Sequence, residues 1–219
     1  MAPQTLGPAL FNGQFPGWPS HPLISLHVLL PPALLKHMKL QHKMHLTELT
    51  IRILTPLSLF IVDSFAHRSA VRTALANDKE WQEKYLSPML TCLDKQENEI
   101  AYLVPWCELG NPTKEGVYEL VTFQMKPGGP AVWGQAFKAA IKAHINTGYT
   151  KLIGVFHTEY GFLNTVNVLW WNEDPDSRAA GRHYAHEDPR VVAAVRESVQ
   201  FLESQRNMLL IPTSFSPLK

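Results

Sequence analysis

The chain has 219 residues, and its 45% hydrophobic content is enough to bury the core of one or two domains. Twenty lysines and arginines stand against nineteen aspartates and glutamates, which argues against a nucleic-acid partner because nucleic acids are bound by strongly basic surfaces. No apolar run reaches the roughly 18 residues that a transmembrane helix needs, and the two cysteines are too far apart for a CxxC metal site or a disulfide framework.

Residues 1–62 form an atypical segment rich in proline, histidine and leucine. Prolines recur through it and limit long regular elements, so we expect it to be poorly ordered, with one short helix between Ala33 and Leu49. The first 47 residues contain no aspartate or glutamate. An acid-poor, mildly basic start is typical of mitochondrial targeting segments, although arginine is absent there and proline is frequent.

From Gly116 onwards the periodicity changes and predicts a βαββαβ order of elements. Pro130 is well placed to begin the first helix and Gly148 to end it. The predicted elements are a strand at 117–123, the helix between Pro130 and Gly148, strands at 152–158 and 164–171 joined by a hairpin, a helical region at 176–203 interrupted at Asp188-Pro189, and a strand at 208–212.

Part of the same unit occurs earlier in the chain. Three residues recur at one constant offset: Arg68, Arg72 and Asp78 match Arg178, Arg182 and Asp188. The match extends over residues 64–106 and ends on a predicted strand at 100–106. Residues 57–62 could be the third strand of this copy, but residues 6–53 show no first strand, helix or hairpin. We therefore predict a tandem repeat with a truncated first copy.

The truncation has a physical consequence for the sheet. The strand at 117–123 carries apolar residues on both faces, with Val121 on one and Leu120 on the other. Helices cover only one face of such a sheet, so the other face needs a second layer. A half repeat leaves that face exposed, and we therefore expect self-association through it.

From about Asp63 to Lys219 the sequence resembles the NIPSNAP family. The segments that carry the resemblance are 65–68 (FAHR), 79–82 (KEWQ), 116–120 (GVYEL), 125–130 (MKPGGP), 157–161 (HTEYG), 169–172 (LWWN) and 186–190 (HEDPR). The resemblance implies an α+β fold of ferredoxin-like repeats of the dimeric α/β-barrel type. It divides the chain into the atypical segment 1–62, a partial first repeat at 63–110 and a complete NIPSNAP domain at 111–219.

The resemblance also implies a function. Family membership implies a mitochondria-associated, sometimes cytosolic, protein with scaffold-like roles that include association with mitophagy. Its partners would be proteins, among them mitophagy adaptors. The family would place its targeting segment within residues 1–62, where this sequence departs from the pattern, so the cytosol is the alternative location. The resemblance supplies no catalytic residues.

Glu119, His157 and Asn167 are the best candidates for a ligand site. Counting along the strands at period two suggests that these three side chains could meet on one sheet face. A carboxylate beside an imidazole can act as base and acid, or can bind a ligand. The alternative is that each side chain is satisfied by a neighbour or faces water. Trp170 and Trp171 either pack against the two faces of the sheet or line a ligand cavity.

Other polar patterns are weaker. His183, His186 and Asp188 have the spacing of a metal site, but their segment is highly charged and is more simply a solvated helix face. Gly128-Gly129 lacks the lysine and serine or threonine of a P-loop, and a strand-to-helix turn explains it. His144 falls on an apolar helix face, where we expect a hydrogen-bonded core histidine. We expect no catalytic residue, cofactor or metal.

Two functional hypotheses follow. The first is a non-enzymatic interaction or scaffold protein, favoured by the family resemblance and by the missing catalytic set. The alternative is a small-molecule binder or enzyme that uses a sheet-lined cavity, which rests on analogy between folds. A closed cavity lined by Glu119, His157 and either Trp170 or Trp171 would favour the alternative. A flat or filled sheet face would favour the first.

Overall fold

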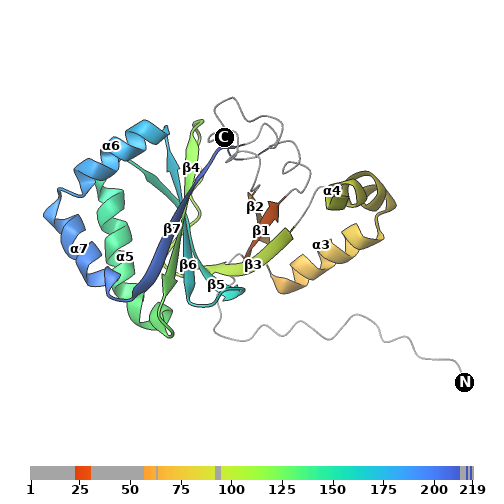
Figure 1. Ribbon diagram of the computed structural model, residues 1–219, viewed down its shortest axis with the longest axis horizontal. Coiled ribbons are helices and arrows are strands. Elements are labelled where there is room, and N and C mark those ends of the chain that lie inside the picture. The colour runs from red at the N-terminus through yellow and green to blue at the C-terminus, as the bar shows by residue number, and fades with distance from the viewer. Residues whose placement is uncertain are drawn as a thin grey trace, which may run out of the picture.

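The computed structural model describes residues 23–30, 57–62, 64–91, 95–212, 216 and 218. Its strands form one seven-stranded sheet in the order β2-β1-β3-β5-β6-β4-β7, and each described pairing is antiparallel. Figure 1 shows helices along one side of the sheet at its C-terminal part, and further helices beyond β3. The chain therefore has an α+β fold.

The N-terminal part contributes three neighbouring strands. β1 (Leu23–Leu30) pairs with β2 (Leu57–Val62) on one side and with β3 (Lys95–Leu103) on the other. β2 coincides with the strand predicted at 57–62. The sequence pattern predicts no strand in residues 6–53, and β1 shows that this prediction is wrong at 23–30. The prolines at 22 and 31 bound β1 and leave eight residues between them for a strand. The helix predicted between Ala33 and Leu49 lies outside the described residues.

Between β2 and β3 the chain is helical. It forms α3 (Phe65–Asn77), the π-helical turn η1 (Trp81–Leu86) and α4 (Ser87–Thr91). Phe65 anchors α3 beside the sheet, because its ring meets the ring of Tyr102 on β3 edge to face at 6.1 Å. β3 begins and ends earlier than the strand predicted at 100–106. Its polar first half adopts strand conformation because it pairs with β1.

The C-terminal part has the predicted order βαββαβ. Its elements are β4 (Val117–Met125), α5 (Gly129–Thr147), β5 (Lys151–Tyr160), β6 (Thr165–Asn172), α6 (Pro175–Ala185), α7 (Pro189–Val199) and β7 (Leu202–Leu210). Gly148 ends α5 in the left-handed conformation, with φ of 80°. The last strand is predicted at 208–212 but begins at Leu202, and its pairing with β4 explains this difference.

The helix pairs in the two parts of the chain begin in the same way. Ser64 accepts a hydrogen bond from the backbone of His67 at the start of α3, and Asp174 accepts one from Ser177 at the start of α6. These two caps are separated by the same offset as the matched arginines. Asp188 caps α7 at the position that matches Asp78 in the N-terminal part, where Asp78 accepts from the Trp81 backbone.

The core lies on both sides of the central strands. Every residue of β6 is buried. Trp133 and Phe137 of α5 pack on the helix-covered face, whereas Leu120 and Trp171 are buried on the opposite face. The apolar side chains that we expect on an open face of β4 are therefore enclosed within the chain. No helix in the described part is long and apolar enough to span a bilayer.

Candidate functional site

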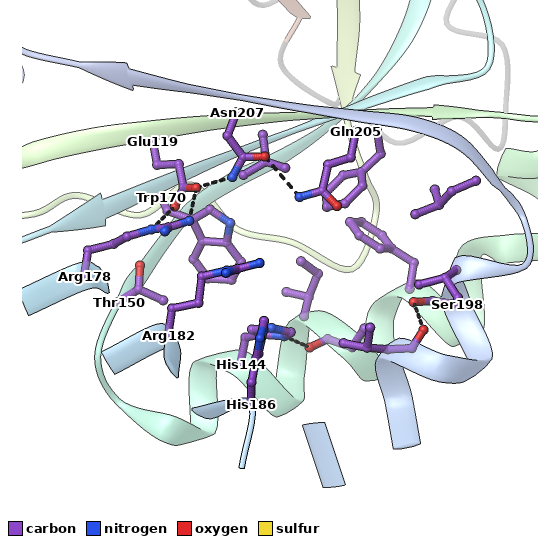
Figure 2. A pocket seen from close by; sticks show the side chains of 18 of the residues that line it. Glu119, His144, Thr150, Trp170, Arg178, Arg182, His186, Ser198, Gln205 and Asn207 are labelled. Carbon is purple, nitrogen blue, oxygen red and sulfur yellow. Dashed lines mark hydrogen bonds and ion pairs between the residues drawn. The ribbon is translucent and has the colours of Figure 1, made fainter. Parts of the chain in front are cut away.

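A cavity of about 140 Å³ lies between the helices and the sheet (Figure 2). The sheet contributes side chains from β4, β6 and β7, and the facing wall comes from α5, α6 and α7. Its polar residues include Arg178 and Arg182 of α6, and its aromatic residues come from β4, α5, β6 and the segment before β5. The cavity therefore presents a ligand with both charged and apolar surface.

Glu119 and Arg178 form the central ion pair of this cavity. The Arg178 Nε donates to the Glu119 Oε2 at 2.9 Å, and its Nη2 donates to the Oε1. The Asn207 amide of β7 also donates to Oε1, and Gln205 donates in turn to Asn207 at 3.0 Å. The Glu119 side chain is 12% exposed and that of Arg178 26%. The negative charge of Glu119 is therefore compensated within the protein.

Arg182 follows Arg178 by one helical turn and also lines the cavity. Unlike Arg178, it has no carboxylate partner among the described residues. The His186 ring lies nearby and meets the His144 ring edge to face, with centroids 5.8 Å apart. Partial burial, followed by the positive charges of Arg182 and the other neighbours, lowers the pKa of His186. This end of the cavity thus has more positive than negative charge.

Tyr149 closes the polar end near α6. Burial raises the pKa of its hydroxyl, so the group stays uncharged at neutral pH and adds no negative charge beside Arg182. A Cβ placed on Gly181 of α6 would come within 2.3 Å of the Tyr149 Cβ. A residue without a side chain at 181 therefore lets α6 pack directly on Tyr149.

The other end of the cavity is aromatic. Trp133 and Phe137 stack with centroids 3.7 Å apart, and Phe123 of β4 meets both rings. The Trp133 indole N–H donates to the Ser198 carbonyl of α7 at 3.1 Å, which fixes the position of the indole. This end offers apolar surface in a fixed arrangement.

A protein-family model described as NIPSNAP matches residues 55–108 and 118–217 of the chain. The chain belongs to the NIPSNAP family. It is 72% identical over 168 residues to Protein NipSnap homolog 3A of Homo sapiens, an alignment that covers 77% of this chain and 68% of that protein. Protein NipSnap homolog 3B of Mus musculus is 74% identical over 157 residues, which are 72% of this chain and 64% of that protein. The names of these two relatives state no reaction.

The fold of this NIPSNAP chain also occurs in distant proteins. A solved structure of an anthrone oxidase-like protein is similar over 88% of this chain and 91% of its own, with a TM-score of 0.54 and 10% sequence identity. At that identity the likeness concerns the fold alone.

The structure separates the three side chains that the sequence analysis groups in this NIPSNAP chain. Glu119 lies opposite Trp170 in the ladder between β4 and β6, and both line the cavity. Asn167 lies opposite Thr122, whose hydroxyl donates to the Asn167 Oδ1 at 2.8 Å on the other face. Trp171 is on that face too, and it is buried. The prediction that Glu119, His157 and Asn167 meet is therefore wrong, because alternation along β6 sends Asn167 away from Glu119.

His157 shares the face of Glu119 but not its cavity. It lies opposite Val166 on β6 and opposite Tyr102 on β3, near the junction of the two parts of the chain. Burial lowers the pKa of its imidazole, and the nearby Glu159 offsets part of this effect. His144 agrees with the expected hydrogen-bonded histidine, since its Nδ1 lies 2.7 Å from the Ala140 carbonyl oxygen.

Several polar residues of the cavity are missing from the sequence-based site, among them Arg178, Arg182, Gln205 and Asn207. The two arginines are members of the repeat match, which is the signal that could have found them. Gln205 and Asn207 precede the strand predicted at 208–212. The described residues contain no group of three side chains able to hold a metal. Asp188, a candidate metal ligand, caps α7 and pairs with Arg190 at 2.7 Å.

Proposed function

We propose that this chain is a non-enzymatic, mitochondria-associated interaction protein of the NIPSNAP type, with the cytosol as its alternative location. It binds other protein chains along the outer edge of β7. Mitophagy adaptors and a second copy of the chain are its partners. The observation that carries the proposal is that β3 is paired on both sides, whereas β7, its counterpart in the second part, pairs only with β4 in the described chain.

The strand order supports two ferredoxin-like repeats, of which the first is truncated. In the second repeat the order is β7-β4-β6-β5, with the last strand beside the first and the second strand at the far edge. The order β3-β1-β2 follows the same scheme as far as it goes. The position equivalent to β5 has no strand in the described part. Within the described residues, the first repeat thus has no counterpart of the second strand.

This missing strand defines the partner surface. The last strand of the first repeat, β3, pairs with the second strand of the second repeat, β5. The equivalent pairing would join β7 to the missing second strand of the first repeat. An unpaired strand edge can be completed by an extended segment of another protein through main-chain hydrogen bonds. Leu209 and Ile211, which are 46% and 48% exposed, add apolar contact surface beside this edge.

Amide hydrogen exchange tests this proposal at the level of single strands. The full chain is compared at low and high protein concentration. The amides of 202–210 become protected at high concentration if β7 pairs with a second copy, while the protection of β6 stays constant because that strand is central. Equal exchange of β7 at all concentrations would contradict self-association at this edge. Fractionation of cells that express the full chain tests its location.

The alternative function is a small-molecule-binding or enzymatic protein. One observation favours it: Glu119 and Trp170, two of the residues expected around a ligand, line one cavity. That cavity lies between sheet and helices, and it lacks His157. In the compensated Glu119–Arg178 pair the carboxylate is fixed by donors rather than placed beside an imidazole. This arrangement supports binding more than acid–base chemistry.

A further inference from the structure

We propose that the cavity between the sheet and α5–α7 binds a small carboxylate whose apolar body is about the size of one benzene ring. The carboxylate contacts Arg182 at the polar end, and the apolar body lies against Trp133 and Phe137. The proposed binding of proteins at the β7 edge does not involve this cavity. The ligand proposal is therefore independent of that interaction.

The cavity holds a positive charge that the carboxylate of Glu119 does not neutralise. The carboxylate of Glu119 accepts hydrogen bonds from both Arg178 and Asn207, so little of its charge is left for Arg182. Arg182 is half-buried and has no carboxylate partner among the described residues. A guanidinium that is partly removed from water and has no counter-ion is stabilised by an incoming anion.

The side chain of Arg182 is positioned to meet a ligand in the cavity. Figure 2 shows its guanidinium pointing from α6 into the space between the sheet and α5. A planar guanidinium can donate two parallel hydrogen bonds to a carboxylate. His186, at the end of the same helix, and Thr150 also line this region. The Thr150 hydroxyl donates to the Trp171 carbonyl at 3.1 Å. Arg182 is therefore the cation that meets the ligand, and the His186 ring lies beside it.

The apolar wall and the size of the cavity define the rest of the ligand. Trp133 and Phe137 are almost fully buried, and Ile141 lies one helical turn further along α5. An apolar protein cavity of about 150 Å³ holds benzene, and this cavity has a volume of about 140 Å³. A monocarboxylate with one ring or a short branched chain fits, whereas a nucleotide is too large. A bare inorganic anion would leave the aromatic wall without contacts.

The response of His186 to pH provides a readout that is independent of affinity. Its pKa is lowered by partial burial and by positive neighbours. A carboxylate bound beside it would favour the protonated ring and raise that pKa. The charged and titratable groups around the ring, from all elements packed here, are Arg178, Arg182 and His183 of α6, His144 of α5, Glu119 of β4 and Tyr149 before β5.

Benzoate is the probe that tests the proposal. Its binding to the full chain is measured by calorimetry, with benzyl alcohol as the uncharged ligand of the same size. We expect benzoate to bind at least about tenfold more tightly than benzyl alcohol, since a charge-assisted pair of hydrogen bonds is lost with the alcohol. We also expect benzoate to raise the pKa of His186 in an NMR titration.

Matched variants locate the site. Arg182→Gln removes the unpaired cation, and we expect it to weaken benzoate binding about tenfold or more while leaving benzyl alcohol unchanged. Arg196→Gln removes an exposed arginine of α7 that does not line the cavity, so it should leave both affinities unchanged. Thermal unfolding confirms that both variants are folded. No benzoate binding, equal affinity for the two ligands, or an equal effect of both substitutions would overturn the proposal.

Discussion

The carboxylate of Glu119 on β4 and the guanidinium of Arg178 on α6 form a two-point ion pair between residues 59 positions apart in the chain. Both side chains are largely removed from solvent, and Asn207 of β7 donates to the same carboxylate. The pair thereby joins a central strand, an edge strand and a covering helix. Its loss should loosen the contact between α6 and the sheet.

Arg178→Gln should lower the free energy of unfolding by roughly 3 kcal/mol, because it leaves the Glu119 carboxylate buried with only Asn207 as a donor. Urea denaturation measures this loss. Lys84→Gln serves as the control, since the Lys84–Glu80 pair is 68% exposed on both sides and should contribute less than about 1 kcal/mol. Similar losses in the two variants would mean that the buried pair contributes no more to the free energy of unfolding than the exposed pair.

Two helical glycines should respond in opposite ways to alanine. A Cβ at Gly134 of α5 would have no heavy atom within 4 Å, so Gly134→Ala should stabilise the chain by about 0.5–1 kcal/mol through helix propensity. A Cβ at Gly181 would lie 2.3 Å from the Tyr149 Cβ, so Gly181→Ala should destabilise it. Thermal unfolding compares the two variants. A stabilising Gly181→Ala would contradict the close packing of α6 on Tyr149.

His157 should make stability depend on pH. Burial lowers its pKa below the ordinary value of 6.5, so the folded state binds a proton less readily than the unfolded state. Stability is therefore complete above the ordinary pKa and falls as the pH drops below it. Unfolding measured between about pH 7.5 and pH 5.5 should show a steeper loss for the natural chain than for His157→Asn. An NMR titration that gave a pKa above 6.5 would contradict this account.

The buried Cys107 should react slowly with thiol reagents. Burial raises the pKa of its thiol, which lowers the fraction of reactive thiolate. In a Cys92→Ser background, Cys107 is the remaining thiol, and its modification should become fast only when urea unfolds the chain. Rapid modification of the folded protein would show that the segment around Cys107 opens readily.

The central strands could be predicted from the sequence because their residues decide their structure. The β-branched and aromatic runs of β4 and β6 leave no good alternative to a buried strand, and Gly148 marks the end of α5. The predicted start of β7 is wrong because residues 203–207 are polar and exposed. Its strand conformation comes from pairing with β4, which a local pattern does not contain.

Only part of the candidate site could be predicted from the sequence, because the site also depends on contacts between elements. Glu119 and Trp170 are predictable because both lie on predicted strands and carry chemically distinctive side chains. The sequence pattern identifies Arg178 and Arg182 only as members of the repeat, because the face that α6 turns to the sheet depends on packing between elements. Asn167 is predicted on the wrong face because a single sequence does not define the register of β6 against β4.

The central claim, that the chain associates with others through the open edge of β7, is tested most directly by light scattering coupled to size-exclusion chromatography. The full chain is compared with Leu209→Lys/Ile211→Lys, which places charges beside the edge, and with Val132→Lys, a control at a 67% exposed position on α5. The account predicts a dimer or larger species for the natural chain and the control, and a monomer for the double variant. A monomeric natural chain at all concentrations would contradict it.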